Sequence, residues 1–335
     1  MLDILKIAGI YTALILGAGF ASGQEILCFF IKFGLKGFWG LFLSGIIFSC
    51  LGYIVCDMAY KKKIHSSHKF LRFIFSDFYL ASQFIIKIFL FMSYSTMLSA
   101  TGAFFKQQFG LENITGIIFM SILCFLLSLN GTDFIAKMNF VIAPVLFIGE
   151  IFVCSYLILV NKTQTTFFIK NSFKWIINAI LYSAYNLITA ICVLISVIQT
   201  VKQKKYAKIG AMLGGFFITL LSLLIGLVIF LNYKIAIKYQ IPMLAITKQI
   251  SDKLNFMYGV IFFLAIFTTA IGNFFALYEM YIDKNFIYKL FISLSAIIFA
   301  QIKFSNLVAN IYPLFGYIGL LEIFLICFAY YNLNK

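Results

Sequence analysis

Long runs of apolar residues alternate with short polar stretches along the whole chain. Each run approaches or exceeds the roughly 20 apolar residues that a helix needs to cross a membrane. No periodic polar face or strand-like alternation interrupts this pattern for long. The pattern predicts about ten transmembrane helices, at about 4–33, 37–58, 78–105, 114–132, 138–160, 172–199, 209–232, 254–282, 286–303 and 306–331.

Composition supports the same fold class. Hydrophobic residues make up 63% of the 335 positions and charged residues only 11%, whereas soluble domains carry roughly a quarter charged residues. One water-facing core cannot bury so much apolar surface, so the bilayer must be the solvent for most of the chain. We therefore expect an all-α integral membrane protein in which residues 1–335 form a single transmembrane domain.

The formal net charge of +15 is a signal of topology rather than of nucleic-acid binding, because the lysines lie between apolar runs and form no single basic face. With a cytoplasmic amino terminus, 14 basic residues fall inside and 11 outside, as the positive-inside rule prefers. Two dense clusters decide the orientation, namely Lys61, Lys62, Lys63, Lys69 and Arg72, and Lys202, Lys204, Lys205 and Lys208. We predict a multi-pass protein of the cell membrane with both termini cytoplasmic, whose partners are lipid and a small-molecule substrate.

The first apolar run has an alternative interpretation as a cleaved signal peptide, because Ala18 and Ala21 resemble a cleavage region. The region before the run is short, with Asp3 offsetting Lys6, and apolar residues resume at Ile26. These features favour a retained membrane segment.

Several features recur in the two halves of the chain at an offset near 170 residues. Gly40–Ser49 parallels Gly210–Thr219, Ala100–Gly102 parallels Ala270–Gly272, and Pro144 with Glu150 parallels Pro313 with Glu322. Each match alone is weak, so the comparison depends on their shared offset. Five spans per repeat is an odd number, so the second repeat would enter the membrane from the opposite side. We expect a 5+5 inverted repeat, with repeat one at about 4–160 and repeat two at about 172–331.

The first span contains three glycines within seven residues: Gly17, Gly19 and Gly23. Each glycine costs a helix roughly 1 kcal/mol relative to alanine, so the cluster favours an unwound segment. Unwound backbone at membrane depth is tolerable only where protein or a wet cavity satisfies it, and it can then bind ions or polar substrates. The alternative is a face of small residues that packs closely against another helix.

The repeat favours the break. The equivalent region of the sixth span contains Tyr182-Ser183-Ala184-Tyr185-Asn186. A buried amide beside two phenol hydroxyls needs hydrogen-bond partners. This pairing predicts that both segments belong to one site.

The eighth span carries two adjacent hydroxyls, Thr268 and Thr269. Such hydroxyls can join backbone carbonyls in an oxygen shell around a small hard cation. Threonine also commonly donates to a carbonyl of its own helix, which is the structural alternative.

Three carboxylates interrupt apolar sequence: Glu25, Glu150 and Glu322. An ionised carboxylate in hydrocarbon is costly, so each is a candidate functional group. Glu25 lies nearest the glycine cluster and is the preferred candidate for gating or proton coupling. Glu150 and Glu322 occupy repeat-related spans and have structural alternatives.

Other chemistries find little support in the sequence. His65 and His68 have HxxH spacing, but in a basic loop that favours solvated histidines over a metal site. The seven cysteines are scattered without a CxxC pair. No phosphate-binding glycine loop and no nucleophile with a base is present, so we expect neither an ATP-driven pump nor an enzyme, and no cofactor beyond a coupling cation.

The residues of the broken span resemble the opening signature of the YkvI-like family of bacterial membrane proteins. The resemblance rests on Gly17–Ile26, Phe29-Phe30 and Phe33-Gly34, and it continues through Tyr182–Asn186, Phe267–Asn273 and Val308–Gly319. It covers nearly the whole chain. That family is similar to the branched-chain amino-acid carriers and, more distantly, to the LeuT-fold (amino acid-polyamine-organocation) transporters.

The resemblance implies a LeuT-like fold with broken helices 1 and 6. It also implies a sodium site in which Thr268 and Thr269 face carbonyls near Ala13 and Leu16. The residues implied to contact substrate are Gly17, Ala18, Gly19, Phe20, Ala21, Ser22, Gly23, Tyr182, Tyr185 and Asn186. The family itself supplies no substrate.

Three functions follow from these features. The leading hypothesis is a symporter, coupled to Na⁺ or another ion, for an amino acid or similarly small polar metabolite. The second is a membrane subunit of a nutrient or germination receptor, which binds a ligand without transporting it. The third is a membrane scaffold with no small ligand.

Overall fold

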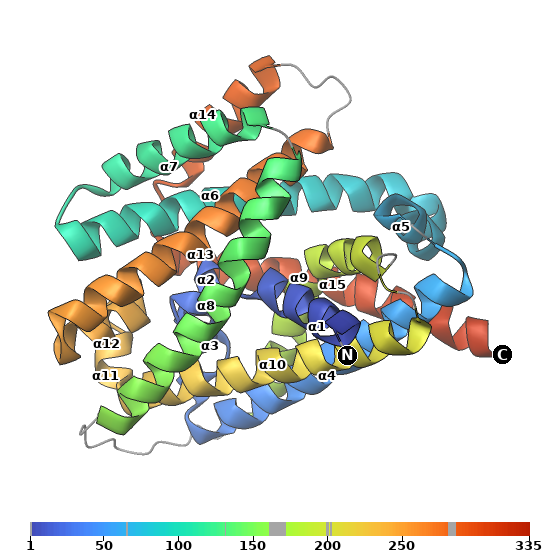
Figure 1. The fold of residues 1–335 in the computed structure, drawn as a ribbon, viewed down its shortest axis with the longest axis horizontal. Coiled ribbons are helices and arrows are strands. Elements are labelled where there is room, and N and C mark those ends of the chain that lie inside the picture. Colours follow the sequence, from blue (N-terminus) through green and yellow to red (C-terminus); the bar gives the residue numbers. More distant parts are fainter. Residues whose placement is uncertain are drawn as a thin grey trace.

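The computed structural model describes residues 2–64, 66–130, 132–160, 172–198, 201, 203–280 and 286–335. His65, one member of the HxxH pair, lies outside them. The chain folds into helices joined by short connections (Figure 1). In order they are α1 Leu2–Ile15, α2 Ala18–Ala21, α3 Gln24–Phe29, η1 Ile31–Phe33, α4 Leu35–Lys61, α5 Ser67–Phe75, η2 Ser76–Phe78, α6 Tyr79–Phe109, α7 Asn113–Leu127, η3 Ser128–Asn130, α8 Thr132–Val160, α9 Lys174–Ile198, α10 Lys204–Leu231, α11 Tyr233–Ala236, α12 Pro242–Ile250, α13 Asp252–Glu279, α14 Phe286–Phe299 and α15 Phe304–Asn334.

The helices follow the apolar runs predicted from the sequence. Within the described part of the chain, seven helical stretches are long and apolar enough to cross a membrane. The shorter α7 and α14 are also apolar, and α1 to α3 make up the first run. The all-α membrane fold is therefore confirmed, whereas the number of helices that cross the bilayer stays a prediction.

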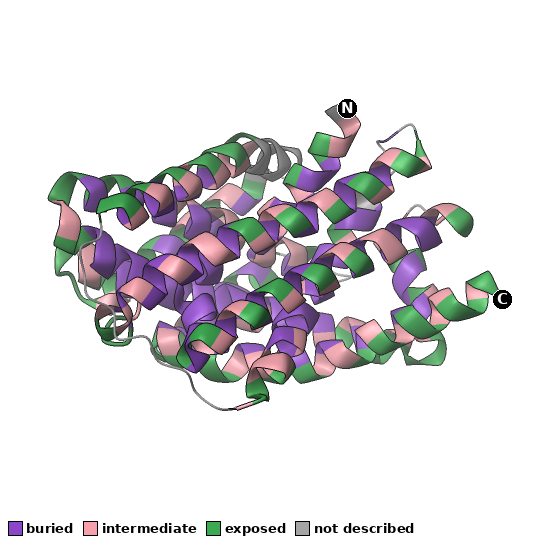
Figure 2. Ribbon diagram, turned by 90° about the horizontal axis from the view of Figure 1, so that it is seen from below, coloured by how far each residue is buried: buried purple, intermediate pink, exposed green. Residues whose placement is uncertain are grey.

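The helices form two groups that meet around the centre of the molecule. In one group α4 packs against α9 and α10, α1 packs against α10, and α15 packs against α9. In the other, α6 packs against α7, α13 and α14, and α8 packs against α13 (Figure 1). Buried residues lie on the faces that meet and exposed residues on the outer faces (Figure 2).

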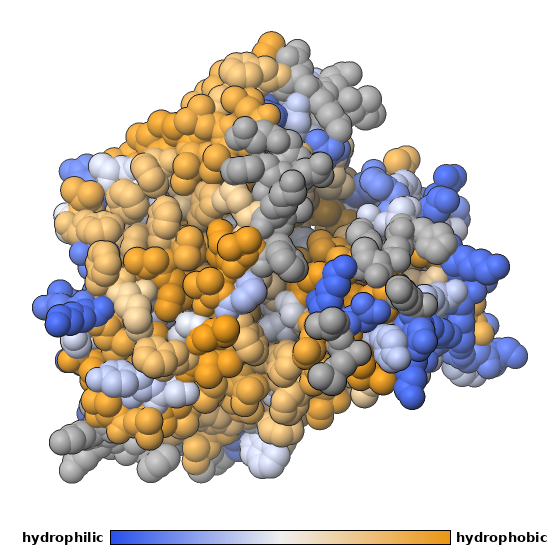
Figure 3. All heavy atoms as spheres, in the orientation of Figure 1, coloured by the Kyte–Doolittle hydropathy of each residue, from blue (hydrophilic) through white to orange (hydrophobic). Residues whose placement is uncertain are grey.

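The face of the molecule drawn in Figure 3 is mostly hydrophobic, as expected of a surface in lipid. On α4, for example, Trp39, Phe42 and Ile46 are exposed at helical spacing. Hydrophilic residues gather at the end of the molecule where α5 and both termini lie (Figures 1 and 3). This polar end and the hydrophobic surface beside it fit a chain embedded in a bilayer.

The first span is interrupted twice, which confirms the predicted break. The helix stops after Ile15, resumes for the single turn α2, and stops again at Ser22 and Gly23. Gly23 has φ +77°, which favours glycine, and a Cβ there would lie 2.6 Å from Ile229 Cδ1. The second interruption therefore needs glycine for both its conformation and its contacts.

The predicted break in helix 6, the sixth span counted from the sequence, is wrong. This span is helix α9 in the structure. α9 is continuous from Lys174 to Ile198, through Tyr182–Asn186. This segment contains no glycine or proline, and two of its polar side chains donate to carbonyl oxygens of the preceding turn. The Ser183 hydroxyl donates to Ala179 O at 2.9 Å, and Asn186 Nδ2 donates to Tyr182 O at 3.0 Å. Nothing in the local sequence opposes the helix.

Candidate functional site

The first interruption of helix 1 exposes backbone oxygen atoms. The Gly17 N–H donates to Ile15 O at 2.8 Å, so the ordinary helical bond to Ala13 O is not made. Among the described residues, no hydrogen bond is made to the carbonyl oxygens of Ala13 or Leu16. These are the two carbonyl groups that the family resemblance implied as cation ligands.

The two threonines of α13 lie against the same interruption. A Cβ on Gly17 would lie 3.4 Å from Thr269 Oγ1, so the hydroxyl lies close to the backbone at this glycine. Thr268 Oγ1 donates to Leu264 O at 3.0 Å and Thr269 Oγ1 donates to Ala265 O at 2.8 Å. Each hydroxyl uses its single proton in this way, and its oxygen lone pairs stay available to a cation.

A cavity of about 1260 Å³ reaches this point from the polar end of the molecule. All four residues implied as the sodium site line it: Ala13, Leu16, Thr268 and Thr269. The starts of α1 and α5 contribute the polar residues Asp3, Lys6, Ser67 and His68 to its wall. The cavity lies among α1, α5, α6, α8, α9 and α13, so both groups of helices line it.

The donor atoms at the inner end of the cavity suit a hard cation. Two hydroxyls and two unpaired carbonyls supply oxygen only, which is the ligand set that small alkali and alkaline-earth cations prefer. The described residues contain no group of three His, Cys, Asp or Glu side chains that could hold a metal ion. The four residues therefore fit a cation held by neutral oxygens better than a transition metal.

The side chain of Glu25 packs against α2, the single turn between the two interruptions. Glu25 is 5% exposed, and its carboxyl group lies directly on Gly19, where a Cβ would be 1.8 Å from Glu25 Oε1. The Tyr185 hydroxyl of α9 donates to Glu25 Oε2. The structure thus brings together Gly19, Glu25 and Tyr185, three residues that the sequence singled out separately.

Aromatic rings surround this carboxyl group. The Tyr185 ring packs against Phe29 and Tyr312, with ring centroids 5.7 and 4.9 Å away, and against Tyr182 at 5.6 Å. The Tyr182 hydroxyl is buried with no hydrogen-bond partner among the described residues. None of these aromatic residues lines the cavity, so the carboxyl group of Glu25 is packed among rings outside it.

The residues implied to contact substrate do not line the cavity in this conformation. None of Gly17 to Gly23, Tyr182, Tyr185 or Asn186 belongs to its wall. Ala18, Phe20, Ala21 and Ser22 are buried, and Ser22 Oγ donates to Gly19 O at 2.7 Å. The cavity therefore ends at the cation-site residues, and the segment beyond them is packed.

One group that the sequence did not single out, Tyr258, also bears on this region. The Tyr258 hydroxyl of α13 contacts both Ala21 O, at the end of α2, and Glu150 Oε1 of α8, the latter at 3.2 Å. Glu322 is also buried, and its Oε1 has no hydrogen-bond partner among the described residues. A tyrosine near the start of an apolar run carries no signal of its own, so only the fold shows this contact.

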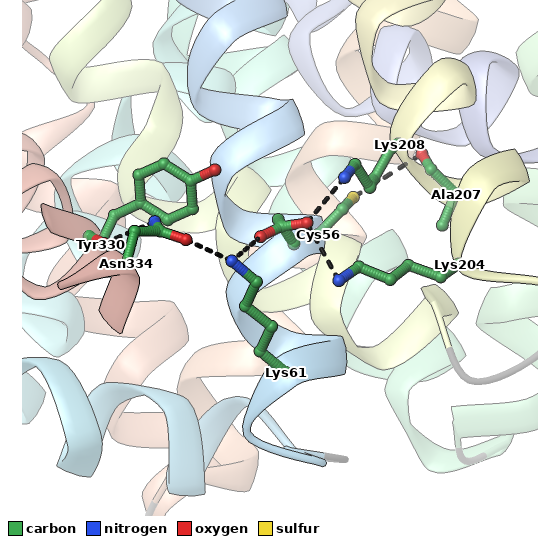
Figure 4. A network of polar contacts seen from close by, with 8 residues as sticks. Cys56, Lys61, Lys204, Ala207, Lys208, Tyr330 and Asn334 are labelled. Atoms are coloured by element: carbon green, nitrogen blue, oxygen red, sulfur yellow. Dashed lines mark hydrogen bonds and ion pairs between the residues drawn. The ribbon is translucent and has the colours of Figure 1, made fainter. Parts of the chain in front are cut away.

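A charged cluster at the polar end joins α4 to α10 (Figure 4). Asp57 is 3% exposed and pairs with Lys61, Lys204 and Lys208 at 3.0, 3.1 and 2.7 Å. Lys61 also donates to Asn334 Oδ1 of α15. From the sequence these lysines are topology signals only, and the aspartate that they share carries no separate signal.

The chain is 30% identical to the membrane protein YkvI of Bacillus subtilis (strain 168) over 328 residues, which covers 94% of this chain and 92% of that protein. The chain belongs to the YkvI family of membrane proteins. A second relative, protein YyaD of the same organism, is 24% identical over 323 residues, or 95% and 93% of the two chains. No protein-family model matches the sequence.

The fold of this YkvI-family chain is similar to that of solved transporters. It matches a manganese transporter of Eremococcus coleocola with a TM-score of 0.61 and 14% identity, over 95% of this chain and 77% of that one. It matches Mhp1, a nucleobase-cation-symport-1 family transporter, with a TM-score of 0.57 and 14% identity, over 96% and 71%. The YkvI-family chain is therefore a membrane protein with the fold of these solved transporters.

Proposed function

We propose that this chain is a secondary active transporter that couples a cation to the movement of an amino acid or similarly small polar metabolite. The observation that carries the proposal is the meeting of the interrupted helix 1 with Thr268 and Thr269 at the inner end of a large cavity. Interrupted helices at mid-membrane are how transporters of this architecture expose backbone groups to ions and substrates.

The conformation supports alternating access. The cavity reaches the candidate cation site from the polar end, whereas Glu25, Tyr185 and the surrounding rings close the other side. A protein open to one side only must rearrange to release on the other. The positive-inside rule favours a cytoplasmic polar end, and on that orientation we infer an inward-open state.

The candidate cation site spans the two groups of helices. Ala13 and Leu16 belong to the segment that packs with α10, and Thr268 and Thr269 belong to α13. A cation bound by all four would attract the two groups toward each other and so favour one arrangement of them. That differential binding is what couples an ion gradient to transport.

Uptake into proteoliposomes tests the proposal. Labelled amino acids and other small polar metabolites are offered with a Na⁺ gradient, with a pH gradient and with neither. Gradient-dependent uptake is expected for at least one compound. No uptake across a broad panel would contradict transport, and saturable binding without uptake would favour the receptor alternative.

Thr269→Val tests the cation site, because valine keeps the shape of threonine and removes the oxygen. We expect the apparent affinity for the coupling cation to fall on the order of tenfold, since one ligand is lost. Thr189→Val is the matched control, because Thr189 lines the same cavity and is not among the proposed ligands. Equal effects of the two substitutions on cation dependence would contradict the assignment.

A further inference from the structure

Glu150 is a buried carboxyl group that the proposed cation site does not use. It is 1% exposed and lies on α8. Its Oε1 is 3.2 Å from the Tyr258 hydroxyl, and its Oε2 is 4.0 Å from Cys154 Sγ. The same Tyr258 hydroxyl contacts Ala21 O, where helix 1 breaks for the second time. A single phenol group thus connects a buried acid to the interrupted helix.

Counting protons shows that this contact has two states. A phenol has one proton to donate, and a backbone carbonyl has none. When Tyr258 donates to Ala21 O, its contact with Glu150 is a hydrogen bond only if Glu150 is protonated and donates to the phenol oxygen. When Glu150 is ionised, Tyr258 donates to the carboxylate, and Ala21 O loses its donor.

The surroundings of Glu150 favour the neutral form. The titratable groups that face it are Cys154 on its own helix and Tyr258 on α13. In the part of the chain that the structure describes, no charged side chain of α1, α10 or α13, the helices packed against α8, pairs with it. An unpaired buried carboxylate is costly, so the acid holds its proton until the site is hydrated or rearranged.

The neighbouring backbone groups show what Ala21 O controls. Ser22 O accepts from the Met243 N–H at 3.1 Å, and Gly19 O accepts from Ser22 Oγ. Among the described residues, the hydroxyl of Tyr258 is the one hydrogen-bond donor to Ala21 O. Losing that bond loosens the joint between α2 and α3, which lies between Glu25 and the part of helix 1 implied to contact substrate.

We propose that Glu150 is a proton-binding site whose occupancy, relayed by Tyr258, controls the second break of helix 1. The proton is then a coupling ion of the transporter, an extension that rests on the proposed function. In the protonated state Tyr258 holds the end of α2 against α13. In the ionised state it turns to Glu150 and frees the joint at Ser22 and Gly23.

Hydrogen exchange of the backbone amides in residues 18–29 tests the switch without any substrate. The purified full-length protein is measured over an acid-to-alkaline series, and rates are corrected for the intrinsic pH dependence of exchange. We expect protection to fall on the order of five- to tenfold as Glu150 ionises, which is the effect of one hydrogen bond. Protection that does not change with pH would overturn the proposal.

Three variants assign the effect. Glu150→Gln places an amide donor beside Tyr258, mimics the protonated acid, and is expected to stay protected at every pH. Tyr258→Phe is expected to be unprotected at every pH. Glu322→Gln, which neutralises another buried acid, is expected to titrate like the unmodified protein. A Glu150→Gln variant that still titrates would overturn the proposal.

Infrared difference spectroscopy supplies a second readout of the same proton. A carboxylic-acid band that disappears with rising pH should be present in the unmodified protein and in Glu322→Gln, and missing in Glu150→Gln. If the switch is observed and proteoliposomes show no uptake, the proposed function fails and the proton site stands. If uptake is observed and no switch is found, only the proton site fails.

Discussion

Gly19 shows at the scale of one residue why the broken segment contains glycine. A side chain there would occupy the place of the Glu25 carboxyl group, because a Cβ would lie 1.8 Å from Oε1 and 2.6 Å from Cδ. Glu25 in turn accepts a hydrogen bond from Tyr185. The glycine therefore serves close approach of a buried acid to the backbone, as well as local flexibility.

Gly19→Ala should displace Glu25 and weaken its bond to Tyr185. We expect the free energy of unfolding to fall by roughly 1–3 kcal/mol, the usual cost of overpacking together with an unsatisfied buried polar group. The melting temperature of the purified protein measures it. Gly9→Ala is the control, because a Cβ on Gly9 has nothing within 4 Å and alanine favours the helix. An equal change in both variants would contradict the role of Gly19.

The sequence predicted some residues of this region and could not predict others. Glycine clusters and buried acids are visible because they are rare and costly in a membrane helix. The contact of Tyr258 with Ala21 joins residues 237 positions apart and has no local signal. Asp57 was overlooked because it lies near lysines that the charge rule already explained.

At the scale of elements, the first predicted span, which forms α1 to α3, differs from the sixth, which forms α9, more than the repeat suggested. Helix 1 has glycine at Gly17, Gly19 and Gly23 and breaks, whereas the equivalent part of α9 has none and continues. The polar residues Ser183 and Asn186 donate to carbonyls of the preceding turn and so remain compatible with a helix. A shared position in a repeat predicts proximity, and local backbone chemistry decides whether a helix unwinds.

The charged cluster at Asp57 ties the ends of two helices together. Asp57→Asn would leave Lys61, Lys204 and Lys208 close to one another without their common partner (Figure 4). We expect the free energy of unfolding to fall by roughly 1–3 kcal/mol, since charged hydrogen bonds are replaced by repulsion between like charges. Melting temperatures over a series of salt concentrations measure the effect, which added salt should reduce.

Asp252→Asn is the matched control for this substitution. Asp252 pairs with Lys248 at 2.5 Å, but both side chains are largely exposed, at 82% and 65%. Exposed pairs contribute about 0–1 kcal/mol, so little change is expected. Equal destabilisation by the two substitutions would show that burial of Asp57 contributes nothing.

At the scale of the whole molecule, the contacts between α4 and α10 support the inverted repeat. A Cβ on Gly45 would lie 1.7 Å from Thr219 Oγ1, and one on Gly215 would lie 2.3 Å from Ser49 Oγ. Gly45 and Gly215, like Ser49 and Thr219, are 170 residues apart. Such reciprocal contacts are what a two-fold relation between repeats produces. The offset found in the sequence thus corresponds to a physical interface. The short helices α5, between α4 and α6, and α12, between α10 and α13, were not predicted.

Orientation and access to the cavity can be tested together with single cysteines in a variant that lacks the native ones. Ser67→Cys lies in the wall of the cavity at the polar end, Thr189→Cys lies further along the same wall on α9, and Lys238→Cys is exposed between α11 and α12. A membrane-impermeant thiol reagent should label the first two only from the cytoplasmic side and the third only from outside, because the lysine clusters favour a cytoplasmic polar end. Labelling of Ser67→Cys from outside would reverse the topology. Labelling of Thr189→Cys from the side of Lys238 would show that the cavity opens the other way.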